Sequence, residues 1–364
     1  MNVTGLSWMT FRLPLRVPFR TANGTMTHRE GLLLRLATAS GLVGLGEASP
    51  HPAAGPGAAQ ELDAVLARVG PRFIGVDVEW LPEGELPAPL ACAFDMAGLD
   101  LLTKERDISV AALLSKQPRS NVAVNATIAV ERDDEAADEA RAARKAGYTC
   151  VKLKVGIAGS VEEACRRVAA VRRALGPDVL LRVDANGAWS VEQAIATIEA
   201  LEEFDLEFVE QPVGADNLEG MRRVRQAVRT AIAADESITS LDAARRVLEL
   251  EAAQILVVKP MVVGGLRAAK EIADVAHEAG VATVITTTID AGVGTAAALH
   301  LAAALPEDGP ACGLATGALL AGDIVIESLS VRESRMKVPR GAGLGVELDE
   351  TTLAQYGGAE RTLP

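Results

Sequence analysis

"VKLKVG", residues 151–156, places two lysines in an otherwise apolar run. Because side chains alternate along a strand, Lys152 and Lys154 would point to the same face. The valines and the leucine around them predict a buried strand. Two ammonium groups on one face at the end of such a strand are either a solvated strand end or part of a site, and the rest of the sequence separates these readings.

The sequence around this stretch repeats one pattern. From about residue 121, short apolar runs alternate with amphipathic helical stretches, which predicts parallel strands joined by helices. Their spacing of roughly 25–30 residues favours a barrel, with an open doubly wound sheet as the alternative. The runs are "VAVNATIAV", "CVKLKVG", "VLLRVDANG", "LEFVEQP", "TAIAADES", "QILVVKP", "VATVITTTID" and "ACGLATG".

The ends of the chain follow a different pattern. The first 50 residues alternate with period two, which predicts antiparallel strands, and residues 56–70 and 88–116 are typical of helices. The tail alternates again after residue 323. We therefore expect an α+β capping domain over residues 1–120, joined by the tail 323–364, and a barrel catalytic domain over residues 121–322.

Composition restricts the functional class. The 364 residues carry a net charge of −13 and 3% aromatic residues, which disfavours binding to nucleic acid or to anionic membranes. No apolar run reaches the ~18 residues of a membrane span, and the N-terminus does not resemble a signal peptide. Its four cysteines lack zinc-binding spacing. We expect a cytoplasmic protein with reduced thiols.

Charged side chains end five successive predicted strands. In a parallel barrel the carboxyl ends of the strands meet at one rim, where the chemistry of such barrels takes place. The pattern therefore predicts that lysines, three acidic positions and a further lysine follow one another around this rim. The residues are Lys152 and Lys154, Asp184 and Asn186, Glu210, Asp235 and Glu236, and Lys259.

Carboxylates from neighbouring strands repel one another unless a cation lies among them. Asp184, Glu210 and Asp235 offer the oxygen ligands that Mg²⁺ prefers, with Mn²⁺ as the alternative, and no cysteine or histidine in the set suggests zinc. The competing interpretation is that each acid caps the helix after its strand. Three such acids in consecutive units favour the metal.

The lysines lie on both sides of these carboxylates in sequence. A carboxylate substrate held at the metal would lie between Lys154 and Lys259. A lysine crowded by other cations loses basicity and can act as a base near neutral pH, and Lys152 would supply such a neighbouring charge to Lys154. Removal of a proton α to a carboxylate gives an enediolate, whose developing charge a divalent metal stabilises.

These motifs resemble those of the enolase superfamily, in its muconate-lactonising subgroup. The matching stretches are "KLK" (152–154), "DANGAW" (184–189), "EQP" (210–212), "ADES" (234–237) and "VKPMVVGG" (258–265), and the resemblance extends over nearly the whole chain. It implies a modified (β/α)₇β TIM-like barrel with an α+β capping domain and one essential Mg²⁺, in keeping with the lysine or histidine bases of enolase-superfamily sites.

The resemblance also separates the reactions of the subgroup. Mandelate-racemase-like members carry a His–Asp pair where this chain has Lys259, and none of its histidines lies at the corresponding positions. Dipeptide epimerases carry Asp-x-Asp on strand eight, where this chain reads "CGLATG". The o-succinylbenzoate synthases, which dehydrate their substrate on the way to menaquinone, look most similar. An N-succinylamino acid racemase is the alternative, followed by a muconate-type cycloisomerase.

The same resemblance suggests substrate contacts. In o-succinylbenzoate synthases the seventh strand is rich in hydroxyl groups and precedes an acid, and "TTTIDAGVG" (286–294) is similar to it. We expect the substrate or the shell around the metal to be contacted by Asn186, Glu236, Thr286, Thr287, Thr288, Asp290, Gly264 and Arg20. The polar segment 15–31 is expected to form a lid at the barrel mouth, with His51 and Pro52 beside it.

Two hypotheses outside the enolase-like enzymes remain. "GVGTAA" (292–297) matches a dinucleotide-binding fingerprint, but a single match in the seventh unit is weak support for a nicotinamide oxidoreductase. A catalytically silent barrel acting as a binding protein is disfavoured because both lysines and all three carboxylates are present. As partners we expect a small-molecule carboxylate and further copies of the chain, with no nucleic acid and no membrane.

Overall fold

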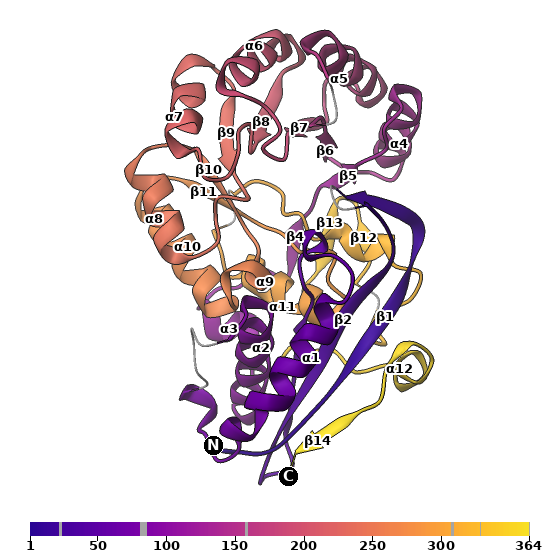
Figure 1. The fold of residues 1–364 in the computed structure, drawn as a ribbon, viewed down its shortest axis with the longest axis vertical. Coiled ribbons are helices and arrows are strands. Elements are labelled where there is room, and N and C mark those ends of the chain that lie inside the picture. Colours follow the sequence, from indigo (N-terminus) through magenta and orange to yellow (C-terminus); the bar gives the residue numbers. More distant parts are fainter. Residues whose placement is uncertain (22–23, 81–85, 157–158, 307–308, 328, 364) are drawn as a thin grey trace.

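The computed structural model describes residues 1–364 except 22–23, 81–85, 157–158, 307–308, 328 and 364 (Figure 1). An antiparallel sheet with strand order β14-β1-β2-β3 forms the capping part. Its long strands β1 (Val3–Thr21) and β2 (Gly24–Thr38) form a hairpin, β3 (Val43–Ala48) lies beside β2, and β14 (Arg361–Leu363) returns from the C-terminus to β1. The expected period-two alternation is therefore present.

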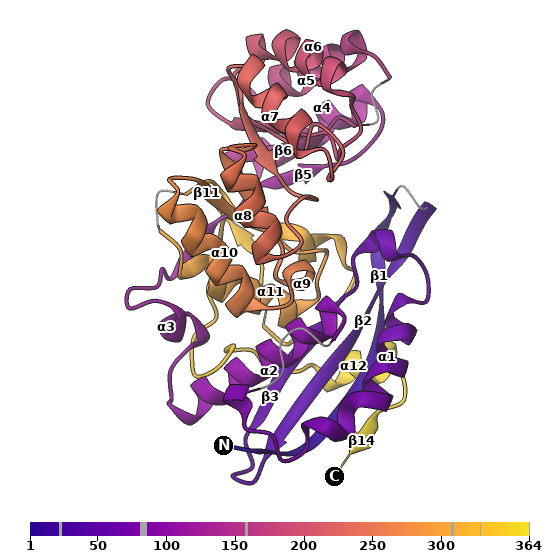
Figure 2. The same cartoon turned by 60° about the vertical axis from the view of Figure 1, so that its left-hand side comes forward.

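Helices α1 (Ala58–Val69) and α2 (Ala88–Glu105) lie against this sheet (Figure 2). The side chains of Leu32, Leu34 and Leu36 alternate into a buried core with α2. Gly44 and Gly46 lie so close to α2 that a Cβ atom on them would come within 2.2 and 2.0 Å of its backbone oxygens. These glycines let β3 and α2 pack without a gap.

Seven parallel strands form the barrel wall in the order β11-β10-β9-β8-β7-β6-β5. A short segment completes the ring, because Cys312 bridges Val124 and Gly313 bridges Thr286. This segment is the expected eighth strand, and the modified (β/α)₇β barrel is confirmed over the doubly wound sheet. The strands are β5 (Ala126–Ile128), β6 (Cys150–Lys154), β7 (Leu180–Asp184), β8 (Leu206–Glu210), β9 (Ala231–Ala234), β10 (Ile255–Val258) and β11 (Ala282–Ile285).

Helices follow the barrel strands and cover the outside of the wall (Figure 1). The apolar faces of these helices join the apolar strands in one continuous core. The helices are α4 (Asp133–Lys145), α5 (Val161–Leu175), α6 (Val191–Leu201), α7 (Leu218–Ala227), α8 (Leu241–Glu249), the short α9 (Pro260–Val263), α10 (Leu266–Glu278) and α11 (Gly292–Ala303).

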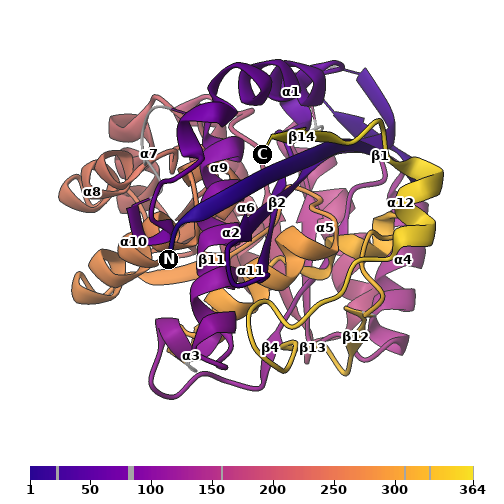
Figure 3. The same ribbon diagram turned by 90° about the horizontal axis from the view of Figure 1, so that it is seen from below.

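The remaining elements connect the two parts. Helix α3 (Val110–Leu114) leads from the cap into β4 (Asn121–Ala123), which forms a small sheet with β13 (Arg335–Lys337) and β12 (Val331–Arg332). The tail continues through α12 (Glu350–Tyr356) to β14, and Figure 3 shows both beside β1. The tail therefore contacts the start of the barrel as well as the cap. None of the helices in the described ranges is long and apolar enough to cross a membrane.

Candidate functional site

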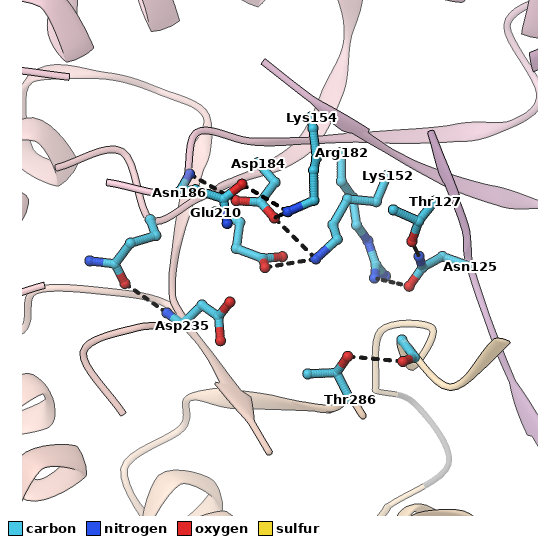
Figure 4. A network of polar contacts seen from close by, with 12 residues as sticks. Asn125, Thr127, Lys152, Lys154, Arg182, Asp184, Asn186, Glu210, Asp235 and Thr286 are labelled. Carbon is cyan, nitrogen blue, oxygen red and sulfur yellow. Dashed lines mark hydrogen bonds and ion pairs between the residues drawn. The ribbon is translucent and has the colours of Figure 1, made fainter. Parts of the chain in front are cut away.

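The charged residues predicted from the strand ends lie at one rim of the barrel, and Figure 4 shows five of them together: Lys152, Lys154, Asp184, Glu210 and Asp235. Lys154 and Asp184 are register partners at the ends of β6 and β7, and Asp184 is in turn the partner of Glu210 at the end of β8. Asp235 directly follows β9 and Lys259 directly follows β10. Parallel register therefore brings three carboxylates and three ammonium groups to one rim.

Lys152 is bound to two of the carboxylates. Its Nζ lies 2.8 Å from Glu210 Oε1 and 3.3 Å from Asp184 Oδ2. The Lys152 side chain is 15% exposed, and the two acids are almost completely buried. This lysine therefore acts as the cation that holds two neighbouring strand ends together.

Lys154 is less enclosed. Its Nζ donates to Asn186 Oδ1 at 2.9 Å and lies 3.6 Å from Asp184 Oδ2, and its side chain is 30% exposed. Both lysines of the opening stretch thus point toward the same carboxylate, as alternation along β6 requires. They differ in their partners: Lys152 is paired with carboxylates at short range, whereas Lys154 donates to a neutral amide.

Lys259 forms an ion pair with Asp235 on the neighbouring strand end. The backbone N–H of Asp235 donates to Gln211 Oε1 at 2.8 Å. Gln211 is fully buried and has a positive φ of 40°. Sequence reasoning missed this role of Gln211, although the residue lies within "EQP"; the signal was a polar residue directly after a buried strand.

The site is dominated by negative charge. Burial, reinforced by Asp184 and Asp235, raises the pKa of Glu210 above its ordinary value although Lys152 acts against it. Burial would also raise the pKa of Asp184, but Lys152 and then Lys154 reverse this and bring it to about 2.

The lysines respond to the same surroundings. Burial lowers the pKa of Lys152 and Lys259, but the carboxylates around them outweigh it and raise both above the ordinary value. Both residues are therefore held in their charged form. The reason is that carboxylates, rather than cations, are their nearest partners.

Asn186 connects Lys154 to a fourth carboxylate. Its Nδ2 donates to Glu236 Oε1 at 2.9 Å, and its own φ of 47° is unusual for a residue other than glycine. The other oxygen, Glu236 Oε2, is buried and has no hydrogen-bond partner within the described part of the chain. Burial raises the pKa of Glu236, and the nearby Asp235 adds to the effect. Both predicted residues therefore belong to the same cluster.

The donor set fits a hard divalent cation. Four carboxylates, those of Asp184, Glu210, Asp235 and Glu236, share three ammonium groups, and one buried carboxylate oxygen lacks a partner. As they are placed, no three His, Cys, Asp or Glu side chains in the described residues are grouped to hold an ion. Lysines pair with one oxygen each of Asp184, Glu210 and Asp235, so an ion among these carboxylates would compete with the lysines for them.

The hydroxyl groups of the seventh strand are engaged in structural bonds. Thr286 Oγ1 donates to Gly313 O at 2.9 Å, and Thr287 Oγ1 lies 2.6 Å from Thr316 Oγ1. Thr288 Oγ1 donates to Asp290 Oδ1 at 2.6 Å. Thr286 and Thr287 thus join strands seven and eight, and substrate contact by these residues stays a prediction.

Asp290 lies at the boundary between barrel and cap, not among the lysines. It shares a fully buried cluster with Arg29 and Glu47, two cap residues that sequence reasoning missed. Arg29 Nε donates to Ile289 O at 2.9 Å, and its charge faces both acids. The available signal was an acid directly after an apolar run of the sequence, as Glu47 is after "GLVGLG".

The remaining predicted contacts lie on the cap side. Gly264, with a φ of 96°, ends α9 and faces Ala91 of α2. A hollow of about 180 Å³ is lined by residues 25–30 of the hairpin and by His51 and Pro52. Burial, and then the charge of Lys259, lower the pKa of His51 to about 4. The side chain of Arg20 and residues 22–23 of the predicted lid lie outside the described residues.

Comparison with known proteins agrees with this geometry. Residues 135–352 match the family model "Enolase C-terminal domain-like", and residues 4–115 match the N-terminal domain of mandelate racemase and muconate lactonizing enzyme. The o-succinylbenzoate synthase of Thermobifida fusca is 35% identical over 95% of this chain and 90% of its own length. A chloromuconate cycloisomerase of Cupriavidus necator is 30% identical, covering 98% and 99% of the two chains.

Solved structures show the same architecture. The dipeptide epimerase of Enterococcus faecalis V583, complexed with Mg and the dipeptide L-Leu-L-Tyr, superposes with a TM-score of 0.88 at 27% identity, over 95% of this chain and 99% of that one. Two matched domain models and a curated relative above 30% identity decide the family. The chain belongs to the enolase superfamily, in its muconate-lactonising subgroup.

Proposed function

We propose that the protein is a Mg²⁺-dependent enzyme that removes the α-proton of a carboxylate substrate, with o-succinylbenzoate synthesis by dehydration as its reaction. The observation that carries the proposal is the rim itself. Lys154 and Lys259 come from strands β6 and β10, and β7, β8 and β9 between them supply the three carboxylates. The 35% identity to an o-succinylbenzoate synthase favours dehydration.

The residues divide the work as follows. Asp184, Glu210 and Asp235 would hold the metal, which when bound would neutralise the substrate carboxylate and the charge that develops on it. Lys154 takes the α-proton, so that the electrons of the C–H bond form the enediolate. The β-hydroxyl then leaves with a proton from the same lysine as water, and a carbon–carbon double bond remains. Lys259 stays protonated and stabilises the enediolate as a fixed cation.

A second candidate is racemisation of N-acylamino acids, which the position of the two lysines favours. A racemase needs a proton donor or acceptor on each face of the α-carbon, and Lys154 and Lys259 are separated by three strands of the wall. A cycloisomerase is third. In the leading assignment the enzyme works in the cytoplasm on a small carboxylate, in a step toward menaquinone, and forms a homo-oligomer.

Isotope exchange at the α-carbon separates the two lysines. We expect Lys154→Ala to abolish dehydration, and Lys259→Ala to lower it because a fixed charge is missing from the transition state. With an N-succinylamino acid in D₂O, Lys259→Ala should still exchange the α-proton of one enantiomer only, and Lys154→Ala that of the other. Lys270→Ala is the matched control, because Lys270 pairs with Asp274 on the exposed face of α10.

Three results would change the assignment. Near-wild-type dehydration by Lys154→Ala would move the role of base to Lys259. Racemisation without dehydration in the wild type would make the second candidate the function. Unchanged α-proton chemistry in both lysine variants would refute the enediolate mechanism altogether.

A further inference from the structure

Helices α10 and α11 begin without a side-chain cap of their own, as do α4 and the short α9. Four earlier barrel helices, α5 to α8, start with a side chain that accepts a hydrogen bond from the first turn: Ser160, Ser190, Asn217 and Ser240. Helices α10 and α11 follow Gly265 and Ala291, which, among the described residues, make no such bond. Since the first N–H groups of a helix lack partners within it, an acceptor must come from elsewhere.

For α10 the acceptor comes from the cap. Asp95 on α2 accepts the N–H of Leu266 at 2.6 Å and that of Arg267 at 3.1 Å on Oδ2, while its Oδ1 pairs with the Arg267 side chain at 2.8 Å. Gly265 makes this approach feasible, because a Cβ atom there would lie 2.6 Å from Asp95 Oδ2. A side chain of the capping domain thus serves as the N-terminal cap of a barrel helix.

For α11 the acceptor again comes from the cap. Glu47 on β3 accepts the N–H of Ala291 on Oε1 and that of Gly294 on Oε2, both at 2.8 Å. Asp323 accepts the N–H of Gly292 at 2.7 Å. A Cβ atom on Gly294 would lie 3.2 Å from the Glu47 carboxyl carbon and 2.9 Å from Asp290 Cβ. The glycines of "GVG" therefore admit carboxylates of the same chain rather than a dinucleotide.

The two capped helices follow segments of the proposed active site. Only α9 and two glycines separate Lys259 from the start of α10. Residues 286–290 lead directly into α11, and Ile289 within them has a φ of 66°, which is unfavourable for a β-branched residue. Arg29 of the cap holds the Ile289 carbonyl. The cap therefore fixes the backbone on both sides of the β10 and β11 strand ends.

We propose that Asp95 and Glu47 are positioning residues. These two residues of the capping domain accept hydrogen bonds from the first N–H groups of α10 and α11, and so hold Lys259 and residues 286–290 in the geometry that the reaction needs. The inference rests on the proposed function for its catalytic part, whereas the capping itself rests on contacts alone. A carboxylate is suited to this task because its two oxygens together accept several N–H groups at a helix N-terminus.

The test uses Asp95→Asn and Glu47→Gln in the full-length enzyme, with Asp100→Asn as the matched control. Asp100 lies on the same helix as Asp95, is fully buried and also accepts two backbone N–H groups, but from Leu45 and Leu344 rather than from a barrel helix. All three changes replace one buried carboxylate by an amide. A general loss of stability should therefore be common to them.

We expect amide hydrogen exchange, followed by mass spectrometry, to accelerate about tenfold or more over residues 260–270 in Asp95→Asn and over residues 288–296 in Glu47→Gln. Asp100→Asn should accelerate neither. Acylation of Lys259 by a small amine-reactive reagent should rise severalfold in Asp95→Asn. The kcat of α-proton exchange should fall roughly tenfold to a hundredfold with little change in KM, because a displaced lysine costs mainly transition-state stabilisation.

Gly294→Ala serves as a second variant, because it keeps Glu47 but obstructs its approach; it should reproduce the exchange pattern of Glu47→Gln. Exchange patterns identical to that of Asp100→Asn would overturn the capping. If the helix starts open locally but both the acylation of Lys259 and kcat stay within twofold of wild type, the positioning role of Asp95 and Glu47 is overturned. A wild type that is inactive on both substrate classes would refute the proposed function only, since exchange and acylation still decide the inference.

Discussion

Replacement of Lys152 by methionine removes the cation between two buried carboxylates. Glu210 and Asp184 lie 2.8 and 3.3 Å from its Nζ, and all three side chains are largely buried. Methionine has a similar length and no charge. The variant therefore tests how much of the stability of the barrel depends on compensating negative charge at the rim.

The size of the effect can be worked out in two ways. At an effective dielectric constant near 20, the two contacts correspond to gross attractions of about 6 and 5 kcal/mol, much of which offsets the cost of burying the lysine. Breaking such a buried pair by removing one partner leaves a net loss of about 3–5 kcal/mol. Independently, the fall in the pKa of Asp184 from 3.8 to about 2 corresponds to about 2.4 kcal/mol.

The sign of the contribution derived from the Asp184 pKa follows from the direction of the shift. A carboxyl group whose pKa is lower in the folded state stabilises the fold above its unfolded value of 3.8, and this contribution is lost as the pH falls through 2. At pH 7.5 it is fully present. Lys152 is the largest of the influences that lower this pKa, so most of the contribution should disappear in Lys152→Met.

Urea unfolding at pH 7.5, followed by tryptophan fluorescence, measures the loss. In the presence of EDTA we expect Lys152→Met to lower the free energy of unfolding by about 3–5 kcal/mol. Lys270→Met, which breaks a partly exposed pair on α10, should change it by less than about 1 kcal/mol. Addition of MgCl₂ should stabilise Lys152→Met more than wild type, because the metal and the lysine compete for the same oxygens.

Two outcomes would refute this reasoning. A loss below about 1 kcal/mol would mean that the carboxylates do not depend on Lys152 for their charge balance. An equal increment from Mg²⁺ in both proteins would mean that metal and lysine do not share ligands, and the metal assignment of Asp184 and Glu210 would then be wrong.

Two further predictions concern other buried charges. Arg182 pairs with Glu207 at 2.6 Å and donates to Ala311 O at 2.7 Å, so it should be a structural cation of the barrel interior. We expect Arg182→Met to lower the free energy of unfolding by about 3–5 kcal/mol, and retained stability in urea would contradict this. Burial, and then Asp290, raise the pKa of Glu47 from 4.5 to about 7, so stability should decline by up to about 3 kcal/mol as the pH rises from 4.5 through 7. Glu47→Gln should flatten that part of the pH profile, and an unchanged slope would show that another group is responsible.

The barrel could be predicted because its signals are local. Apolar runs such as "VLLRVD" and the helices between them repeat along the chain, and parallel register then brings the strand ends to one rim without further information. The eighth strand was predicted from "ACGLATG" but is reduced to single bridges at Cys312 and Gly313. Strand length there is set by the neighbours that close the ring, which no local pattern contains.

The cluster at the rim was predictable for the same reason, whereas its connections to the cap were not. Sequence position identifies Asp184 and Glu210 as strand ends, but nothing local links Glu47 to the start of α11, since the donor Ala291 is 244 positions away from this acceptor. The resemblance to o-succinylbenzoate synthases suggests Asp290 as a substrate contact, which stays a prediction. What no local pattern contains is its place beside Arg29 and Glu47, two cap residues that are far away in sequence.

The two lysines of the opening stretch face the same carboxylate but cannot do the same work. A lysine that neutralises two buried carboxylates is held in its charged form, which is the state of Lys152, with its pKa raised above the ordinary value. A base must give up its proton and reach substrate. Lys154 has the more exposed side chain, and its closest partner is the neutral amide of Asn186. Alternation along one strand thus supplies both a structural cation for the acidic rim and, two residues later, a lysine free enough to serve as the base.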